Sequence, residues 1–145
     1  MKTVLDANVI VSGIARYDEG DSPPVLVVRA AVDGKYRLVL SEEILGEATF
    51  ALSKRYYGAR FGESDIAENF LKVRRAARVV KLSSRIHDVA THWQDDRVLE
   101  TALVGRADYL VTGDKELLAL DHPFAFRIIH PNAFLLLLEG DEGGG

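Results

Sequence analysis

The stretch that decides the fold is MKTVLDANVIVS, residues 1–12, in which polar residues interrupt an apolar run. Val4 and Leu5 on one side, with Val9–Val11 on the other, indicate a buried strand at the start of the chain. Such a strand has no structural need for Asp6, because moving a carboxylate from water into a protein interior costs free energy. We therefore expect a functional role for Asp6. The alternative is a turn in which the carboxylate bonds its own backbone.

Short apolar runs alternate with helix-like segments along the rest of the chain. Strands that alternate with helices are typical of right-handed crossovers. We therefore predict an α/β fold, a single domain with a five-stranded, mainly parallel sheet flanked by helices on both faces. The predicted strands are residues 3–5, 37–40, 79–82, 109–111 and 127–129. The predicted helices are residues 22–31, 41–52, 64–77, 95–104 and 116–120, with a last helix that starts at Pro131.

Composition agrees with one globular domain and excludes several classes of protein. The length of 145 residues, with 48% hydrophobic and 28% charged residues, is enough to form one sizeable core. We expect the domain to cover residues 1–138, and the glycine-rich end, residues 139–145, to be a disordered tail. No apolar run approaches the roughly 18 residues of a membrane span, so we expect no membrane association.

The N-terminus shows no secretory signal pattern, and the chain has no cysteine, which excludes disulfides and thiolate metal sites. Both features suit a cytoplasmic protein. The net charge of −4 argues against binding to nucleic acid by charge alone. It is compatible with an enzyme whose acidic side chains hold metal ions.

Acidic residues follow the predicted strands at several points. Asp6 directly follows the first strand, and Asp114 follows the fourth. Glu47 lies on the helix after the second strand, and Asp95 and Asp96 open the helix that leads to the fourth. Because ligands of open parallel sheets bind beyond the carboxyl ends of the strands, these acids should approach one edge of the sheet.

The electrostatic cost of such a cluster indicates a metal site. Two like charges about 5 Å apart repel by roughly 3 kcal/mol at an effective dielectric constant near 20. A divalent cation removes this repulsion, and Mg²⁺ or Mn²⁺ prefers carboxylate and water oxygens. Three structural alternatives stay open. In the first, Glu47 is a solvated helix residue. In the second, Asp114 caps the next helix, and in the third, one of Asp95 and Asp96 is a helix cap.

Four stretches of the sequence resemble, in order, the successive motifs of the PIN-domain nucleases. The most similar branch is that of the toxin components of toxin–antitoxin systems. The resemblance implies a five-stranded parallel sheet between helices, metal-dependent cleavage of RNA phosphodiester bonds, and, commonly, a homodimer. The stretches are VLDANVIVSGI (4–14), LSEEILGEATFAL (40–52), QDDRVLETALVGRADYLVTGDKELLAL (94–120) and RIIHPNAFL (127–135).

The resemblance also assigns roles to individual residues. Asp95 fits the third acid by its register before Leu99 and Ala102. The segment HDVATHWQDD (87–96) departs from the Asp-Pro-type segment that usually precedes this acid, so Asp96 stays open as the alternative ligand or as a supporting residue. Supporting positions fall on Asn8, Ser12 and Thr112. The implied catalytic and metal-binding residues are Asp6, Glu47, Asp95 and Asp114.

RNA binding needs cations near the acidic site. Lys54, Arg55 and Arg60, with Tyr56 and Tyr57 between them, are candidates to bind phosphate and stack on bases. The alternative is a solvated helix face or a contact between subunits.

Together with the acidic cluster, the resemblance implies an Mg²⁺- or Mn²⁺-dependent endoribonuclease that acts on single-stranded or structured RNA, and we expect it in the cytoplasm. The resemblance adds the expectation that it is a toxin with an antitoxin partner. One alternative is a non-catalytic PIN-like interaction protein. The other is an aspartate-dependent phosphohydrolase, which would carry a second aspartate at position 8, where this chain has Asn8.

Overall fold

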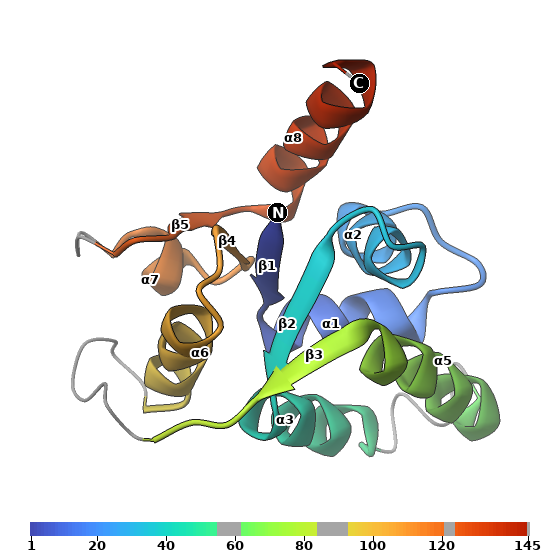
Figure 1. Cartoon of the computed structure of the whole chain (residues 1–145). Coiled ribbons are helices and arrows are strands. Elements are labelled where there is room, and N and C mark those ends of the chain that lie inside the picture. The colour runs from blue at the N-terminus through green and yellow to red at the C-terminus, as the bar shows by residue number, and fades with distance from the viewer. Residues whose placement is uncertain (55–61, 84–92, 121–123, 145) are drawn as a thin grey trace.

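The computed structural model describes residues 1–54, 62–83, 93–120 and 124–144 (Figure 1). Five parallel strands form one sheet in the order β3-β2-β1-β4-β5, which confirms the predicted α/β fold. The strands are β1 (Lys2–Leu5), β2 (Arg37–Ser41), β3 (Ala77–Val80), β4 (Tyr109–Val111) and β5 (Arg127–Ile129).

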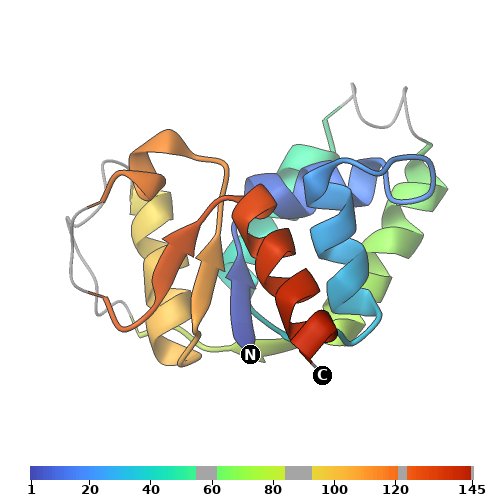
Figure 2. The same ribbon diagram turned by 90° about the horizontal axis from the view of Figure 1, so that it is seen from above.

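Helices cover both faces of this sheet (Figure 2). In that view α6 and α7 lie on one side, and α1, α2, α5 and α8 lie on the other. In the described part of the chain, no helix has the length and apolar character that crossing a membrane requires. The helices are α1 (Ala7–Ala15), α2 (Pro23–Val32), α3 (Glu42–Leu52), α5 (Glu63–Ala76), α6 (Trp93–Val104), α7 (Lys115–Leu118) and α8 (Pro131–Gly144).

The opening stretch differs from the sequence-based expectation in one respect. The strand ends at Leu5, as its predicted bounds require, but Val9–Val11 lie in helix α1, which the apolar pattern did not predict. Asp6 is the N-cap of this helix, and its side chain accepts a hydrogen bond from the backbone of Ala7. A short β-branched run that is buried on all sides has no periodicity that separates a strand from a helix.

Other boundaries depend on local signals. Ser41 caps α3 by accepting a hydrogen bond from the backbone nitrogen of Ile44 at 3.3 Å, and Ser22 precedes two prolines in the first turn of α2. Strand β3 starts two residues before the predicted position, because α5 ends at Ala76 and passes directly into the strand. The division between residues 1–138 and a tail stays a prediction; α8 extends to Gly144.

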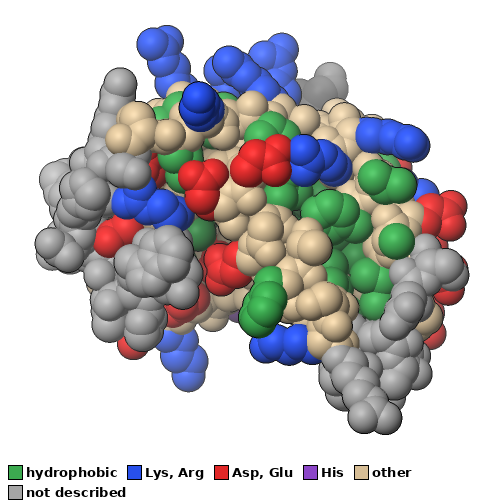
Figure 3. All heavy atoms as spheres, turned by 90° about the horizontal axis from the view of Figure 1, so that it is seen from below, with side chains coloured by type: hydrophobic (Ala, Val, Ile, Leu, Met, Phe, Trp, Pro, Cys, Tyr) green, Lys and Arg blue, Asp and Glu red, His purple; other side chains and the backbone are tan. Residues whose placement is uncertain are grey.

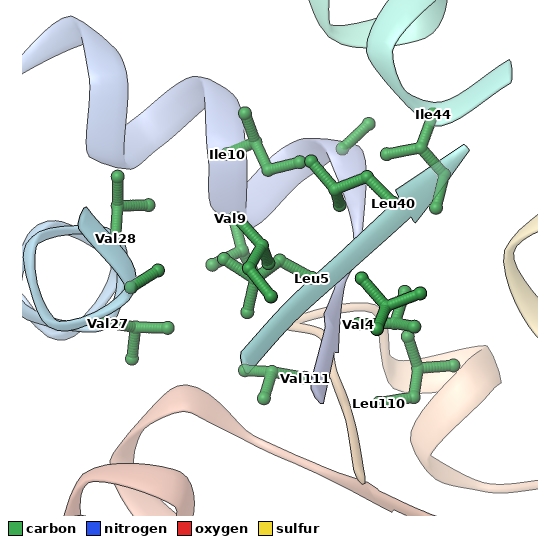
Figure 4. Close-up of a cluster of buried hydrophobic side chains, with 14 of the residues drawn as sticks. Val4, Leu5, Val9, Ile10, Val27, Val28, Leu40, Ile44, Leu110 and Val111 are labelled. Atoms are coloured by element: carbon green, nitrogen blue, oxygen red, sulfur yellow. The ribbon is translucent and has the colours of Figure 1, made fainter. Parts of the chain in front are cut away.

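The core lies between the sheet and its helices. Figure 4 shows Val4 and Leu5 of β1 in one cluster with Val9 and Ile10 of α1 and with Val28 of α2. Each of these side chains is at most 2% exposed. Because both faces of β1 are covered by apolar side chains, the end of this strand is held rigidly in the middle of the sheet.

Gly13 allows α1 to approach α2 closely, which yields a first prediction. A Cβ atom at this position would lie 2.3 Å from Cγ2 of Val28 and 2.8 Å from the carbonyl oxygen of Pro24. Overpacking of this kind costs typically about 1–3 kcal/mol. We expect Gly13→Ala to lower the free energy of unfolding, measured by urea denaturation.

Gly46 in α3 provides the matched control, because nothing lies within 4 Å of an added Cβ there. Gly46→Ala should stabilise the protein by up to about 1 kcal/mol through helix propensity alone. Equal effects of the two substitutions would contradict the close approach of α1 and α2.

Candidate active site

The candidate site lies where the connections from two neighbouring strands diverge. Strands β1 and β4 are paired, but the chain leaves β1 through α1 and β4 through α7, on opposite sides of the sheet (Figure 2). The carboxyl ends of such strands form the crevice in which open α/β sheets bind ligands. Asp6 follows β1 and Thr112 follows β4, so both residues lie at this crevice.

Asp6 is a buried carboxylate held by hydrogen bonds from two elements. It is 5% exposed. Its Oδ1 accepts from the backbone nitrogen of Ala7 at 2.7 Å, and its Oδ2 accepts from the hydroxyl of Thr112 at 2.7 Å. The bond from Ala7 is a local backbone contact of the kind that the structural alternative describes, and the functional role of Asp6 stays a prediction. The carboxylate is fixed in orientation by β4 and by the N-terminus of α1.

Thr112 connects Asp6 to Asp114. Its hydroxyl oxygen accepts from the backbone nitrogen of Asp114 at 3.0 Å. Asp114 is half-buried and is also the N-cap of α7, since its Oδ1 accepts from the backbone nitrogen of Glu116 at 2.8 Å. The predicted cap and the predicted acid of the site are thus the same residue.

The pKa shifts of Asp6 and Glu47 relate Asp6 to two other acids. The pKa of Asp6 is raised above its ordinary value, first by burial, while the Thr112 and Ala7 hydrogen bonds act in the opposite direction and the charge of Asp114 raises it further. Glu47 is exposed on α3, yet its pKa is raised by partial desolvation and by the charge of Asp6. Asp6 is therefore coupled electrostatically to Asp114 on one side and to Glu47 on the other.

Asp95 and Asp96 approach the same edge from α6. Strands β1 and β2 point downward in Figure 1 and α6 runs back upward, so the N-terminal turn of α6 lies at the carboxyl edge of the sheet. Both aspartates belong to that first turn. Asp96 is 4% exposed, whereas Asp95 is half-buried. The greater burial of Asp96 is the feature that the sequence pattern did not reveal.

Figure 3 looks onto this carboxyl edge of the sheet. Asp and Glu side chains gather near the middle of the face, and Lys and Arg side chains lie around it. A cavity of about 370 Å³ is found elsewhere, at the amino ends of the strands, and none of the candidate acids lines it. The chemistry of the acids, rather than the depth of a pocket, therefore defines the candidate site.

The supporting residues lie in different places. Asn8 and Ser12 are exposed on α1, four residues apart and hence on one side of the helix. Lys54 is exposed just after α3, with its ammonium group 6.0 Å from the centre of the Phe50 ring. Arg55 and Arg60 lie outside the described residues.

The acidic side chains described above fit the open coordination of an ion such as Mg²⁺ better than a site in which protein ligands alone enclose the metal. Within the described ranges, no three Asp, Glu, His or Cys side chains are gathered closely enough to hold a metal ion by themselves. Mg²⁺ retains several water ligands and is usually bound through one or two carboxylates and the phosphates of the substrate. An open site with a rigid Asp6 and coupled Glu47 and Asp114 is compatible with that mode of binding.

Sequence reasoning missed a polar network on α6. Glu100 and Thr101 are fully buried, and Arg97 forms an ion pair with Glu100 at 2.6 Å. Their signal in the sequence is their position next to Leu99 and Ala102, on the apolar side of the helix. Polar residues in such positions require partners from neighbouring elements.

Comparisons with known proteins agree with this architecture. The protein PAE2754 of Pyrobaculum aerophilum has a similar structure with a TM-score of 0.64 and 22% identity, covering 97% of this chain and 90% of that one. VapBC2 of Rickettsia felis, bound to a DNA fragment from its promoter, is similar with a TM-score of 0.56 and 11% identity, and the match covers 90% of this chain and 98% of that one. VapC20 of Mycobacterium tuberculosis, a toxin that cleaves the sarcin–ricin loop, is similar with a TM-score of 0.55 and 14% identity, and the match covers 86% of this chain and 98% of that one.

At these levels of identity the solved structures establish the fold. No curated protein matches the chain significantly. The family model of the PIN domain matches residues 2–116, which include every candidate acid described above. The chain therefore belongs to the PIN-domain family, the nuclease family that its sequence motifs resemble.

Proposed function

We propose that the protein is a metal-dependent endoribonuclease that hydrolyses RNA phosphodiester bonds. The observation that carries the proposal is the buried carboxylate of Asp6 at the diverging ends of β1 and β4, coupled to Asp114 and Glu47. A purely structural aspartate cap does not need a further acid such as Asp114, whose charge raises the free energy of its ionised form.

The residues of the site have separate roles in this proposal. Asp6, Glu47, Asp114 and one of Asp95 and Asp96 would hold Mg²⁺ or Mn²⁺. When bound, such an ion neutralises charge on the phosphate and lowers the pKa of a bound water molecule. Hydrolysis of this kind leaves a 5′-phosphate and a 3′-hydroxyl.

Thr112 is a positioning residue in this site. Its hydroxyl donates to Asp6 and accepts from the backbone of Asp114, so it fixes the two acids relative to each other. Asn8 and Ser12, on the exposed side of α1, are supporting residues. Lys54, with Arg55 and Arg60 beyond it in sequence, would contact the phosphates of single-stranded or structured RNA.

The biological role that we propose is that of a cytoplasmic toxin from a toxin–antitoxin pair, acting as a homodimer and restrained by an antitoxin protein. Support comes from the fold shared with VapC20, a toxin that cleaves the sarcin–ricin loop, and with the VapBC2 complex. Purification of the chain from its native cells tests this role. An inhibitory protein should copurify with it and should suppress cleavage when added back.

The direct test of the activity is cleavage of end-labelled RNA with Mg²⁺, with Mn²⁺ and with EDTA. We expect cleavage with either ion and none with EDTA. Glu47→Gln should reduce kcat/KM by about 10- to 100-fold, because the variant loses one charge at the metal. Glu43→Gln, an exposed position on the same helix, should leave cleavage unchanged. Cleavage that survives EDTA, or is equal in both variants, would contradict the proposal.

The third acid can be identified by comparing two variants of α6. The burial of Asp96 leads us to expect that Asp96→Asn reduces cleavage by about 10²-fold or more, and Asp95→Asn by less than about 10-fold. The measurement is kcat/KM over a series of Mn²⁺ concentrations. If kcat/KM falls more in Asp95→Asn than in Asp96→Asn, Asp95 is the third acid, as the sequence motif indicates.

A further inference from the structure

We propose that Arg97 and Glu100 are positioning residues that set the place of the first turn of α6, and thereby of its aspartates, relative to Asp6 and Glu47. The inference rests on the proposed function of those acids. The pair is called the α6 clamp below, together with Ser83 and Thr101, which bond to it, and Ser41, which bonds to Thr101.

Glu100 is the centre of the clamp. It is fully buried, and its Oε2 lies 2.6 Å from Nη1 of Arg97, one helical turn earlier. Its Oε1 accepts from the backbone nitrogen of Ser83 at 2.8 Å. Ser83 lies shortly after the end of β3. A single carboxylate therefore joins the chain that leaves β3 to the helix that carries Asp95 and Asp96.

Thr101 extends the clamp to α3. Its hydroxyl lies 2.8 Å from the hydroxyl of Ser41, and both residues are fully buried. Ser41 ends β2 and caps α3, the helix that carries Glu47. The clamp thus fixes α6 against the element that supplies another acid of the site.

Stability alone does not account for this arrangement. The Arg97 and Glu100 side chains are only 13% and 1% exposed, so both charges lose most of their hydration. A buried ion pair is often no more stabilising than apolar residues of the same volume, because desolvation offsets the Coulomb attraction. The pair lies within α6 and does not by itself place the helix. It fixes the orientation of the Glu100 carboxylate, whose hydrogen bond from the backbone nitrogen of Ser83 reaches outside α6.

The second observation is the location of the clamp. Asp96 lies four residues before Glu100, and hence on the same side of α6. Asp96 and Glu100 are both buried on this helix, which contacts β1 and β2. A rotation or shift of α6 that relaxed the Glu100 contacts would therefore displace Asp96 as well.

The test uses a variant that removes both charges without leaving one unpaired. Arg97→Met/Glu100→Gln keeps similar side-chain volumes and keeps an acceptor for the backbone nitrogen of Ser83. Arg74→Met/Glu42→Gln is the matched control. Its ion pair is also 2.6 Å long, but its side chains are 43% and 61% exposed.

Three quantities are measured on the full chain. The first is amide hydrogen exchange in residues 95–98 without metal or RNA. The second is the Mn²⁺ concentration that gives half of the maximal rise in melting temperature, and the third is kcat and KM for RNA. We expect the clamp variant to exchange at least about 10-fold faster in the first turn of α6 and to need about 10- to 100-fold more Mn²⁺. Its kcat should fall while KM changes little, and its melting temperature without metal should stay close to that of the wild type.

The control variant should match the wild type in all three quantities. Unchanged exchange and unchanged half-saturating Mn²⁺ in a folded clamp variant would overturn the inference. If the double variant does not fold, Thr101→Val gives the comparison instead, because it removes the hydrogen bond to Ser41 and leaves no charge unpaired. A wild-type protein that neither cleaves RNA nor responds to Mn²⁺ would refute the proposed function, whereas exchange in α6 would still decide whether the clamp positions the helix.

Discussion

Asp6→Asn should abolish metal-dependent cleavage of RNA, with kcat lower by at least about 10²-fold, while the fold remains intact. The carboxylate is buried, oriented by Thr112 and Ala7, and coupled to Asp114. Asparagine has the same shape, caps helices as well as aspartate does, and can still bond Thr112. It has no negative charge with which to hold a cation. The measurement is the cleavage rate of end-labelled RNA under saturating Mn²⁺.

Thr112→Val tests the orientation of the Asp6 carboxylate separately from its charge. It leaves Asp6 ionisable but removes the hydroxyl that connects it to Asp114. Its rate should fall between those of the wild type and Asp6→Asn. Full activity of Asp6→Asn would remove Asp6 from the catalytic site altogether.

Asp6→Asn should also change the stability of the protein by an amount that depends on pH. Because the folded-state pKa of Asp6 is raised, its contribution to stability is complete below the unfolded-state value of about 3.9 and is lost as pH rises through the folded-state value. Without metal, Asp6→Asn should therefore be more stable than the wild type at pH 7, with the difference shrinking toward pH 4. Melting temperatures of both proteins in EDTA between pH 4 and 8 give this difference. A gap that does not vary with pH would contradict the raised pKa.

Divalent ions should stabilise the folded wild type strongly, which is the second large effect. A ligand that binds only the native state adds about 2.7 kcal/mol at a concentration 100 times its Kd. For a chain of 145 residues this corresponds to a rise in melting temperature of roughly 5–10 °C. The binding energy includes relief of the repulsion among Asp6, Glu47 and Asp114.

Differential scanning fluorimetry in EDTA, Mg²⁺, Mn²⁺ and K⁺ measures the rise. Asp6→Asn should show almost none of it, and Glu43→Gln should show all of it. An equal rise with K⁺ at the same ionic strength would indicate screening of surface charge instead of a specific site. No rise with any divalent ion would favour a PIN-like protein without catalysis.

Several features of this protein follow from local sequence alone. Alternating apolar runs and capped helices predicted the five strands and most helices, because periodicity and turn chemistry act within a few residues. The same pattern placed Asp6 and Asp114 after strands, so both were expected at the carboxyl edge of the sheet. That expectation depended on the first and fourth strands being neighbours, which the pairing of β1 with β4 satisfies.

Other features were decided by the tertiary structure. Val9–Val11 form a helix because Asp6 caps it and Gly13 lets it pack on α2, and no periodicity in a fully buried run announces this. The burial of Asp96 results from the packing of α6 against the sheet.

The sequence by itself therefore determined the class of fold and the chemical type of the site, since both follow from residue types and their local order. Only the tertiary structure decided which acids influence one another and what holds them in place. The partners of Asp6 and Glu100, Thr112 and Ser83, lie 106 and 17 residues away along the chain. Burial and charge coupling between residues so far apart exist only once the strands and helices have packed together.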